Sequence, residues 1–340
     1  MALEAAEAPA VCRAQLDANA ELMSELAARL RRESPRFAAT LARGSSDQAA
    51  TFAKVLVELH AGVPMLSHAP SIGAIYRATS PSFDGIPLLA ISQSGRSPDL
   101  IMATQDAQRQ GALVVAVVND AQSPLAIGSD IVIPIHAGPE RSVAATKTLI
   151  ATLFALTHLA AEWGQDEALL SALAEAPEIL ERASATDWSE AAPIIAQAQD
   201  LLVVGRGYTL PIAGEAALKL KEVAGIHAEA FSSAEVAHGP MTLIGAQDPV
   251  LVLGPLDRAG AGLAERIADF VSRGATVLAS GRPEDVGGAS ILLPSDTSVH
   301  PAIGAIAAVQ SFYGLALAVA AIRGRDPDRP PHLAKVTRTL

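Results

Sequence analysis

Short runs of apolar or β-branched residues alternate along this chain with longer, alanine-rich segments that repeat an apolar residue every three or four positions. The short runs are typical of buried parallel strands, and the longer segments are typical of helices that cover a sheet. In the first half the predicted strands are residues 86–92, 113–119 and 130–135, with a weaker strand near 38–41, and the predicted helices are 98–110 and 143–163. The alternation predicts an α/β fold with parallel sheets.

The second half repeats this order. Its predicted strands are residues 201–204, 249–253, 275–279 and 289–293, and its predicted helices are 210–223, 262–272 and 303–322. Gly44 and Gly207 both follow an arginine, and Gly111 and Gly274 both precede an alanine, and each pair is 163 residues apart. Two matches at one offset indicate a tandem duplication.

Four segments follow from this organisation. They are N-terminal helices plus a first domain over 1–163, a helical linker over 164–199, a second domain over 200–324, and a proline-rich tail over 325–340. The linker is polar, rich in alanine and interrupted by Pro177 and Pro193, which favours a boundary there. From its composition alone, the tail would be solvated.

The composition fits a globular enzyme or binding protein. The 340 residues favour two domains, and a chain with 50% hydrophobic and 18% charged residues is expected to pack compactly. The formal net charge is −11 and no basic run follows the chain, so nucleic acid is not an expected partner. The single cysteine, Cys12, excludes an intrachain disulfide and fits a reducing cytoplasm.

Neither export nor a membrane partner is expected. The first twenty residues carry Glu4, Glu7 and Asp17 and lack the apolar region of a signal peptide. The most apolar late stretch, residues 315–322, is only 8 residues long, far below the ~20 that cross a bilayer. A soluble, cytoplasmic protein is predicted.

Two serine-rich loops are candidates for binding an anion. Ser92, Gln93, Ser94 and Ser97 follow a predicted strand and precede a helix that starts near Pro98. Hydroxyls at a helix N-terminus, with its unpaired N–H groups, can hold a phosphate without a net positive charge. The alternative is that a serine simply caps an ordinary helix.

The second loop, Gly44-Ser45-Ser46, follows the weaker strand, so both loops would lie at the carboxyl edge of one sheet, where ligands bind. Neither loop is a Walker A sequence, and no Gly-x-Gly-x-x-Gly fingerprint opens either half. The histidines also lack metal-ligand spacing. We therefore expect no nucleotide, no other cofactor and no metal.

A charged stripe marks the second half. Glu215, Lys219 and Glu222 stand at positions i, i+4 and i+7 of a predicted helix, and His227 and His238 follow it. The stripe could be a solvated set of ion pairs. A carboxylate and an imidazole beside a phosphate site, however, are what sugar-phosphate isomerisation needs, one to open the ring and one to move a proton between C1 and C2.

With these motifs in view, the chain resembles the tandem sugar-isomerase (SIS) domains of glucosamine-6-phosphate synthase. Six motifs recur in the same order: 92–95 (SQSG), 143–147 (VAATK), 217–222 (ALKLKE), 226–230 (IHAEA), 238–240 (HGP) and 332–335 (HLAK). The resemblance covers nearly the whole chain. It implies two three-layer α/β/α SIS domains with parallel, flavodoxin-like sheets.

The resemblance also implies roles for individual residues. A sugar phosphate would be bound by Gly44, Ser45, Ser46, Ser92, Gln93, Ser94 and Ser97, with Val143, Ala145 and Ala334 lining the site. Glu222 would move the proton between C1 and C2, and His238 and Lys219 would assist ring opening. Lys335 would form a Schiff base with the open-chain ketose, whose protonated imine acts as an electron sink. The family often supplies the histidine from a neighbouring subunit, which implies a homodimer.

Several residues differ from the synthase pattern. Arg43 stands in place of a cysteine, Ala145 in place of a serine, and Arg96 and Ser97 in place of Glu and Thr. The stretch before the first predicted strand is too short for the synthase's glutaminase domain, so glutamine-dependent synthesis is not expected.

The chain therefore resembles most closely the second type of glucosamine-6-phosphate deaminase, which releases fructose 6-phosphate and ammonia. Three alternatives stay open: a galactosamine 6-phosphate deaminase, a fructosamine 6-phosphate deglycase, and a regulator that binds a phosphosugar without turnover.

Overall fold

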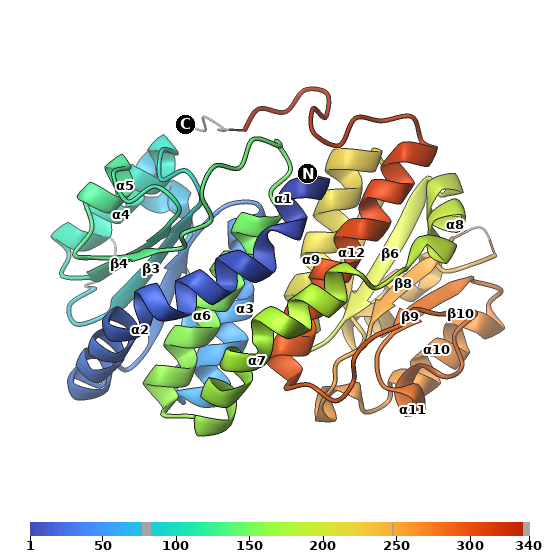
Figure 1. Cartoon of the computed structure of the whole chain (residues 1–340), viewed down its shortest axis with the longest axis horizontal. Coiled ribbons are helices and arrows are strands. Elements are labelled where there is room, and N and C mark those ends of the chain that lie inside the picture. Colours follow the sequence, from blue (N-terminus) through green and yellow to red (C-terminus); the bar gives the residue numbers. More distant parts are fainter. Residues whose placement is uncertain (77–82, 247, 336–340) are drawn as a thin grey trace. The chain divides into compact units, whose positions relative to one another are not determined.

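The computed structural model of this chain describes residues 1–76, 83–246 and 248–335, and it divides them into two compact units (Figure 1). The first unit comprises Glu7–Glu140, Lys147–Glu175 and, within the described tail, residues 333–335. The second unit comprises Met1–Ala6, Arg141–Thr146 and Ala176–His332. The chain therefore passes between the units more than once, including on either side of Arg141–Thr146.

The first unit is built on a parallel five-stranded sheet. Its strands are β1 (Ala38–Leu41), β2 (Met65–Ser67), β3 (Pro87–Ser92), β4 (Leu113–Val118) and β5 (Ile131–Pro134), in the order β2-β1-β3-β4-β5. Every residue of β3 and β4 is buried, which explains their continuous apolar sequences.

Helices cover both faces of this sheet. They are α2 (Ala8–Glu33), α3 (Ser45–His60), α4 (Pro98–Arg109), α5 (Pro124–Ile127) and α6 (Lys147–Gly164), with a π-helical turn η1 (Ile72–Tyr76). In Figure 1, α4 and α5 lie on one side of β3 and β4, and α2, α3 and α6 form the layer on the other side. The result is a three-layer α/β/α arrangement, as the sequence predicted.

The second unit repeats the same architecture. Its strands are β6 (Asp200–Gly205), β7 (His227–Ser232), β8 (Val250–Leu253), β9 (Val277–Ser280) and β10 (Ile291–Leu292), all parallel, in the order β10-β9-β8-β6-β7. Its α-helices are α1 (Ala2–Ala6), α8 (Ala192–Gln197), α9 (Thr209–Lys219), α10 (Leu263–Ser272), α11 (Pro283–Val286) and α12 (Pro301–Ile322). Short helical turns are η2 (Ser189–Ala191), η3 (Leu220–Ala224), η4 (Glu235–His238), η5 (Pro240–Leu243) and η6 (Arg258–Gly260). The helix α7 (Glu167–Ser184) contributes its first half to the first unit and its second half to the second.

The two sheets have one topology, because each strand of the first unit has a counterpart five strands later at the same place in its sheet. The paired glycines also share their backbone conformations. The φ angles are 60° at Gly44 and 57° at Gly207, and 93° at Gly111 and 90° at Gly274. These observations support the tandem duplication that the sequence indicated.

Two strands, β2 and β7, were not predicted. The strand β2 has three residues, and β7 carries exposed His227 and Glu229 in an edge position, so neither shows a clear apolar pattern. The helix predicted over 143–163 begins only at Lys147, because Glu140 accepts a hydrogen bond from the backbone N–H of Thr148 and thereby caps the helix there. The helix predicted over 210–223 becomes π-helical from Leu220.

The sequence also led us to underestimate the length of the apolar segment near the C-terminus. The apolar segment around 315–322 belongs to α12, which has 22 residues and is the single helix, among the described residues, that is long and apolar enough to cross a membrane. In the second unit 67% of its most apolar window is buried, and it packs against α8 and α9. A mostly buried core helix can have the same length and apolar composition as a membrane-spanning helix.

Candidate active site

The two serine loops lie next to each other in the first unit. Strands β1 and β3 are neighbours in register, with Leu41 opposite Ala90, and the chain leaves them in opposite directions across the sheet. Ser45 and Ser46 open α3 directly after β1, and residues 92–97 connect β3 to α4. The point where the strand order reverses is the usual ligand site of an open α/β sheet.

The loop after β3 has a fixed backbone. Gly95 has a φ of 60°, and a Cβ atom there would lie 2.1 Å from Oγ of Ser123, so only glycine fits. The Ser92 hydroxyl accepts a hydrogen bond from the Gly95 N–H at 3.2 Å, and the Ser94 hydroxyl accepts one from the Arg96 N–H at 3.3 Å. Both hydroxyls keep their hydrogens available to an anion.

Ser97 occupies the N-cap position of α4, but among the described residues its hydroxyl accepts no capping hydrogen bond. The capping interpretation therefore does not account for this serine. Gln93 is half-buried, and its backbone carbonyl accepts a hydrogen bond from the Asn119 N–H at 3.2 Å.

Arg43 links the two loops. Its Nε and Nη2 atoms donate to Oδ2 of Asp99, in the first turn of α4, at 3.1 and 3.0 Å. The Asp99 side chain is 3% exposed, whereas that of Arg43 is 51% exposed. Arg43 thus holds the first loop to the helix of the second and leaves a cation beside both.

Lys335 lies in the same unit and pairs with Glu140. Its Nζ atom donates to Oε2 of Glu140 at 2.7 Å. The segment before Glu140 is fixed by Asn119, whose side chain donates to the Gly138 carbonyl at 2.7 Å and accepts from the Ala137 N–H at 2.9 Å. Since the Asn119 N–H also donates to the Gln93 carbonyl, continuous contacts connect the loop after β3 with the segment that leads to Glu140.

Two further predicted site residues, both from the motif 143–147, lie in the second unit. Val143 and Ala145 are half-buried in Arg141–Thr146, the stretch that precedes α6. The Val143 N–H donates to the Asp328 carbonyl at 3.3 Å, and the Ser142 hydroxyl donates to Oδ1 of Asp328 at 2.7 Å. The base of the tail is thereby held to this stretch, and Ala334, further along the tail, is exposed.

The charged stripe of α9 is not a solvated surface. The side chains of Glu215 and Lys219 are 0% and 1% exposed, and that of Glu222, in the π-helical turn η3, is 22% exposed. Lys219 Nζ lies 3.3 Å from Oε1 of Glu215 and donates to Oε2 of Glu222. Enclosing the charges of Glu215 and Lys219 costs stability unless they are paired, and here they are paired with each other.

Burial by itself would lower the pKa of Lys219, but the Glu215 and Glu222 carboxylates outweigh it and raise the pKa above its usual range. Lys219 is therefore a cation, and it presents a positive charge to the partly exposed Glu222. A carboxylate held beside a fixed ammonium is suited to carry a proton between two carbons.

The two histidines differ in their surroundings. His227 is exposed on the edge strand β7 and pairs with Asp200 at 2.7 Å. His238 ends η4, is exposed, and forms no hydrogen bond or ion pair within the described part of the chain. The predicted site residues thus fall into two sets: the serine loops and Lys335 in the first unit, and Val143, Ala145, Lys219, Glu222 and His238 in the second.

Sequence reasoning missed Glu140 and Asn119. Glu140 stands in a polar loop with no periodic pattern, and its importance comes from a contact with Lys335, 195 residues away. Asn119 appeared in the sequence analysis only as the last residue of the strand predicted over 113–119, without a role in the site. A side chain with both a donor and an acceptor at the carboxyl end of a buried strand was the available signal.

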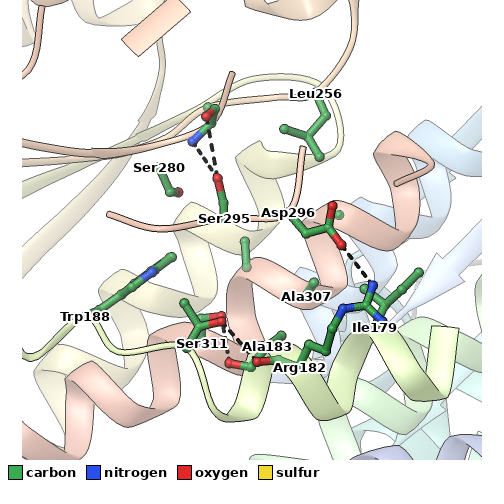
Figure 2. Close-up of a pocket in the computed structure, with 15 residues that line it drawn as sticks. Ile179, Arg182, Ala183, Trp188, Leu256, Ser280, Ser295, Asp296, Ala307 and Ser311 are labelled. Carbon is green, nitrogen blue, oxygen red and sulfur yellow. Dashed lines mark hydrogen bonds and ion pairs between the residues drawn. The ribbon is translucent and has the colours of Figure 1, made fainter. Parts of the chain in front are cut away.

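The second unit has a pocket at the carboxyl ends of β8 and β9 (Figure 2). Its charged lining residues, Arg182 and Asp296, pair with each other at 2.9 Å. At the neighbouring position that corresponds to the first unit's serine loops, the Thr209 hydroxyl donates to the Leu253 carbonyl at 2.6 Å. This edge of the second unit therefore lacks the features of the serine loops.

Comparisons with known proteins agree with this architecture. The family model of the SIS domain matches residues 34–162 and 194–279. The chain is 36% identical over 310 residues to the glutamine–fructose-6-phosphate aminotransferase (isomerizing) of Zymomonas mobilis subsp. mobilis, an alignment that covers 87% of the chain and 51% of that relative. The chain thus spans about half the length of the curated relatives it matches.

Solved structures give the same picture. A proposed phosphosugar isomerase from Silicibacter pomeroyi DSS-3 has a TM-score of 0.90 and 42% identity, over 96% of this chain and 99% of that one. The C-terminal domain of glucosamine-fructose-6-phosphate aminotransferase from Francisella tularensis has a TM-score of 0.85 and 26% identity, over 96% and 97%. Glucosamine-6-phosphate deaminase from Thermotoga maritima, with a TM-score of 0.78 and 20% identity over 99% and 98%, shares the fold.

Proposed function

This chain belongs to the SIS domain family, and we propose that it is a phosphosugar isomerase that converts glucosamine 6-phosphate into fructose 6-phosphate and ammonia. The observation that carries the proposal is the enclosed pair of Glu215 and Lys219 in α9, whose lysine also binds the partly exposed carboxylate of Glu222 in the adjoining turn η3. Ion pairs that only make a helix soluble would lie on its exposed face, whereas Glu215 and Lys219 are enclosed at a cost in stability. A carboxylate that must gain and lose a proton during turnover gives a reason for this cost.

The serine loops are the proposed phosphate site. They lie at the strand-order reversal of the first sheet, at the N-termini of α3 and α4. The hydroxyls of Ser92 and Ser94 brace the loop as acceptors and can donate to a phosphate, and Arg43 adds a cation beside both loops. Gly44, Ser45, Ser46, Gln93 and Ser97 complete the proposed set.

The chemistry is proposed to begin with ring opening by His238, assisted by Lys219. Glu222 then moves the proton between C2 and C1, which turns the 2-amino aldose into a 2-imino ketose. Lys335 displaces ammonia from C2 and holds the ketose as an imine until water releases fructose 6-phosphate. Val143, Ala145 and Ala334 would line the sugar.

The names of the similar proteins support an amino sugar phosphate as the substrate. The curated relatives are named as enzymes that make an amino sugar phosphate from fructose 6-phosphate, and one solved relative is named as a glucosamine-6-phosphate deaminase. Both activities contain the same isomerisation between a C1 aldehyde and a C2 centre that carries nitrogen. For this chain we propose the deaminating reaction, with no metal or cofactor, in the cytoplasm.

A homodimer is part of the proposal. His238 is exposed and has no hydrogen-bond or ion-pair partner within the described residues, as expected of a side chain that would act in the site of a neighbouring subunit. No nucleic acid or membrane is proposed as a partner.

Two other amino-sugar phosphates are candidate substrates: galactosamine 6-phosphate, which carries nitrogen on C2 as glucosamine 6-phosphate does, and fructosamine 6-phosphate, which carries it on C1 beside a C2 ketone. Ammonia or amine release from all three substrates, measured with the purified chain, tests the assignment. The proposal expects glucosamine 6-phosphate to give the highest kcat/KM. Release of nothing from any of the three would contradict an enzymatic role and leave a phosphosugar-binding regulator as the better account.

A further inference from the structure

We propose that Glu140 is the catalytic proton-transfer group for Lys335: it relays protons from Nζ while the imine forms, and it stays as the counter-ion of the protonated imine. This inference rests on the proposed function, because it needs the imine at Lys335. It adds a residue that neither the motifs nor the comparisons assign to the reaction.

The geometry of Glu140 carries the inference. Its side chain is 0% exposed, and Oε2 lies 2.7 Å from the Lys335 Nζ, the atom that would attack the sugar. The same carboxylate accepts the Thr148 N–H on Oε1 at 3.2 Å and the Thr148 hydroxyl on Oε2 at 2.7 Å. The Glu140 carboxylate is therefore fixed at the start of α6, and Lys335 of the tail forms its ion pair with this fixed group.

Charge explains why the pair should persist through the reaction. A buried carboxylate without a cation beside it is costly. Lys335 supplies a positive charge as an ammonium before the reaction, and a protonated imine supplies the same charge on the same nitrogen afterwards. Glu140 thus faces one positive charge in both states.

The steps between these states balance. Glu140 takes one proton from the Lys335 ammonium, and the neutral Nζ attacks C2 of the ketose to form the C–N bond. The proton passes to the former carbonyl oxygen, Nζ gives a second proton to Glu140, and the hydroxyl takes it and leaves as water. The nitrogen lone pair then closes the C=N bond, and Glu140 is a carboxylate again.

The same relay applies when C2 carries nitrogen. The two protons that leave Nζ then go in turn to the imine nitrogen on C2: the first makes it an amino group, and the second lets it depart as ammonia while the protonated lysine imine forms. No oxidant, reductant or other reactant is consumed. Hydrolysis of the imine reverses the relay and returns Lys335 to its ammonium.

The chain offers a matched control. Lys147, whose side chain is 2% exposed, also forms an ion pair with a glutamate of the first unit, Glu7. This second pair contains a lysine and a glutamate but no group of the proposed reaction. In this pair the lysine is the enclosed partner and the Glu7 side chain is 55% exposed, so Glu7→Gln measures what the loss of a lysine–glutamate pair does to the unit by itself.

The test is covalent trapping. The full chain is incubated with fructose 6-phosphate and sodium cyanoborohydride, which reduces protonated imines, and the modified peptide containing Lys335 is quantified by mass spectrometry. We expect Glu140→Gln to lower the trapping rate at neutral pH by about 100-fold, the size of a general acid–base contribution. Glu7→Gln should stay close to the wild type.

A second variant guards against a purely structural effect. Formate added to Glu140→Ala should raise its trapping rate at least ~10-fold, because a small carboxylic acid can replace the missing proton relay, and it should leave Glu7→Ala unchanged. Trapping in Glu140→Gln as fast as in the wild type, or no rescue by formate, would overturn the role of Glu140. No adduct even in the wild type would refute the Lys335 imine itself, and with it this part of the proposed function.

Discussion

Nζ of Lys219 lies 3.3 Å from Oε1 of Glu215 and also donates to Glu222, so a single buried ammonium serves two carboxylates three and four residues away. One of these carboxylates is fully enclosed and the other is 22% exposed. The enclosed Glu215 helps to keep the lysine charged, and the lysine holds the partly exposed Glu222 in place by its hydrogen bond.

Replacing Glu222 by Gln should stop turnover without stopping binding. The amide keeps the shape of the side chain but cannot accept the C2 proton, so kcat for ammonia release should fall by about 1,000-fold. The dissociation constant for fructose 6-phosphate, measured by calorimetry, should change by less than ~3-fold, a small free-energy difference. A variant that keeps more than a tenth of the wild-type rate would exclude Glu222 as the base.

Removing the lysine should destabilise the second unit. Lys219→Met leaves Glu215 buried without its cation, which we expect to lower the free energy of unfolding by about 3–5 kcal/mol in urea titrations. Lys221→Met, two residues further on at an exposed position, is the control and should change it by no more than ~0.5 kcal/mol. Equal effects of the two substitutions would contradict the buried network.

The stability of the first unit should depend on pH through His158. Burial lowers the pKa of this imidazole from 6.5 to about 4, and Glu162, 4.0 Å away, is too distant to counter it. Between these pH values the unfolded chain binds the additional proton, so the free energy of unfolding falls as the pH is lowered from 6.5 towards 4.

The loss from this one group should reach about 3 kcal/mol. Urea unfolding of the wild type and of His158→Gln across this pH range measures it, with the exposed His227→Gln as the control. The slope should be smaller in His158→Gln and unchanged in His227→Gln. A slope that His158→Gln leaves intact would show that other groups cause the acid sensitivity.

Gly95→Ala should damage phosphate binding specifically. The added Cβ would lie 2.1 Å from the Ser123 hydroxyl at a residue with a φ of 60°, so the loop between β3 and α4 must move. We expect KM for the sugar phosphate to rise at least ~10-fold because the loop's donors are displaced. Gly62→Ala has a similar φ of 68° and no heavy atom within 4 Å among the described residues, so it should leave KM near the wild-type value.

A shared site would show itself by complementation between subunits. His238→Asn and Glu222→Gln chains should each be nearly inactive alone. Mixed in equal amounts and allowed to exchange subunits, they should recover about a quarter of the wild-type activity, since half of the dimers would then hold one intact site of two. No recovery, with exchange confirmed by native mass spectrometry, would mean that Glu222 and His238 act within one chain.

The sequence carried most of the fold because the buried strands β3 and β4 are continuous apolar runs and the helices on them repeat at a helical period. The sequence predicted less of the candidate site than of the fold. The spacing of Glu215, Lys219 and Glu222 fixes one helix face but does not distinguish a solvated face from an enclosed one. The neighbouring residues Ala213, Ala216, Ala217 and Leu220 show that α9 is apolar around most of its circumference, which is the signal for enclosure.

Long-range contacts were beyond local patterns. The pairing of Lys335 with Glu140 joins the tail to a loop through one ion pair, and no periodicity or propensity encodes it. The link from Arg43 to Asp99 is similar, because it depends on β1 and β3 being neighbours in the sheet. Strand β2 escaped prediction for a different reason: with three residues it is too short to show an alternating pattern.

The most direct test of the account is to quantify ammonia and fructose 6-phosphate together while the purified chain acts on glucosamine 6-phosphate. The account predicts that the two products appear in equal amounts, at a rate that the wild type sustains and Glu222→Gln does not. Absence of both products, or ammonia without fructose 6-phosphate, would contradict it.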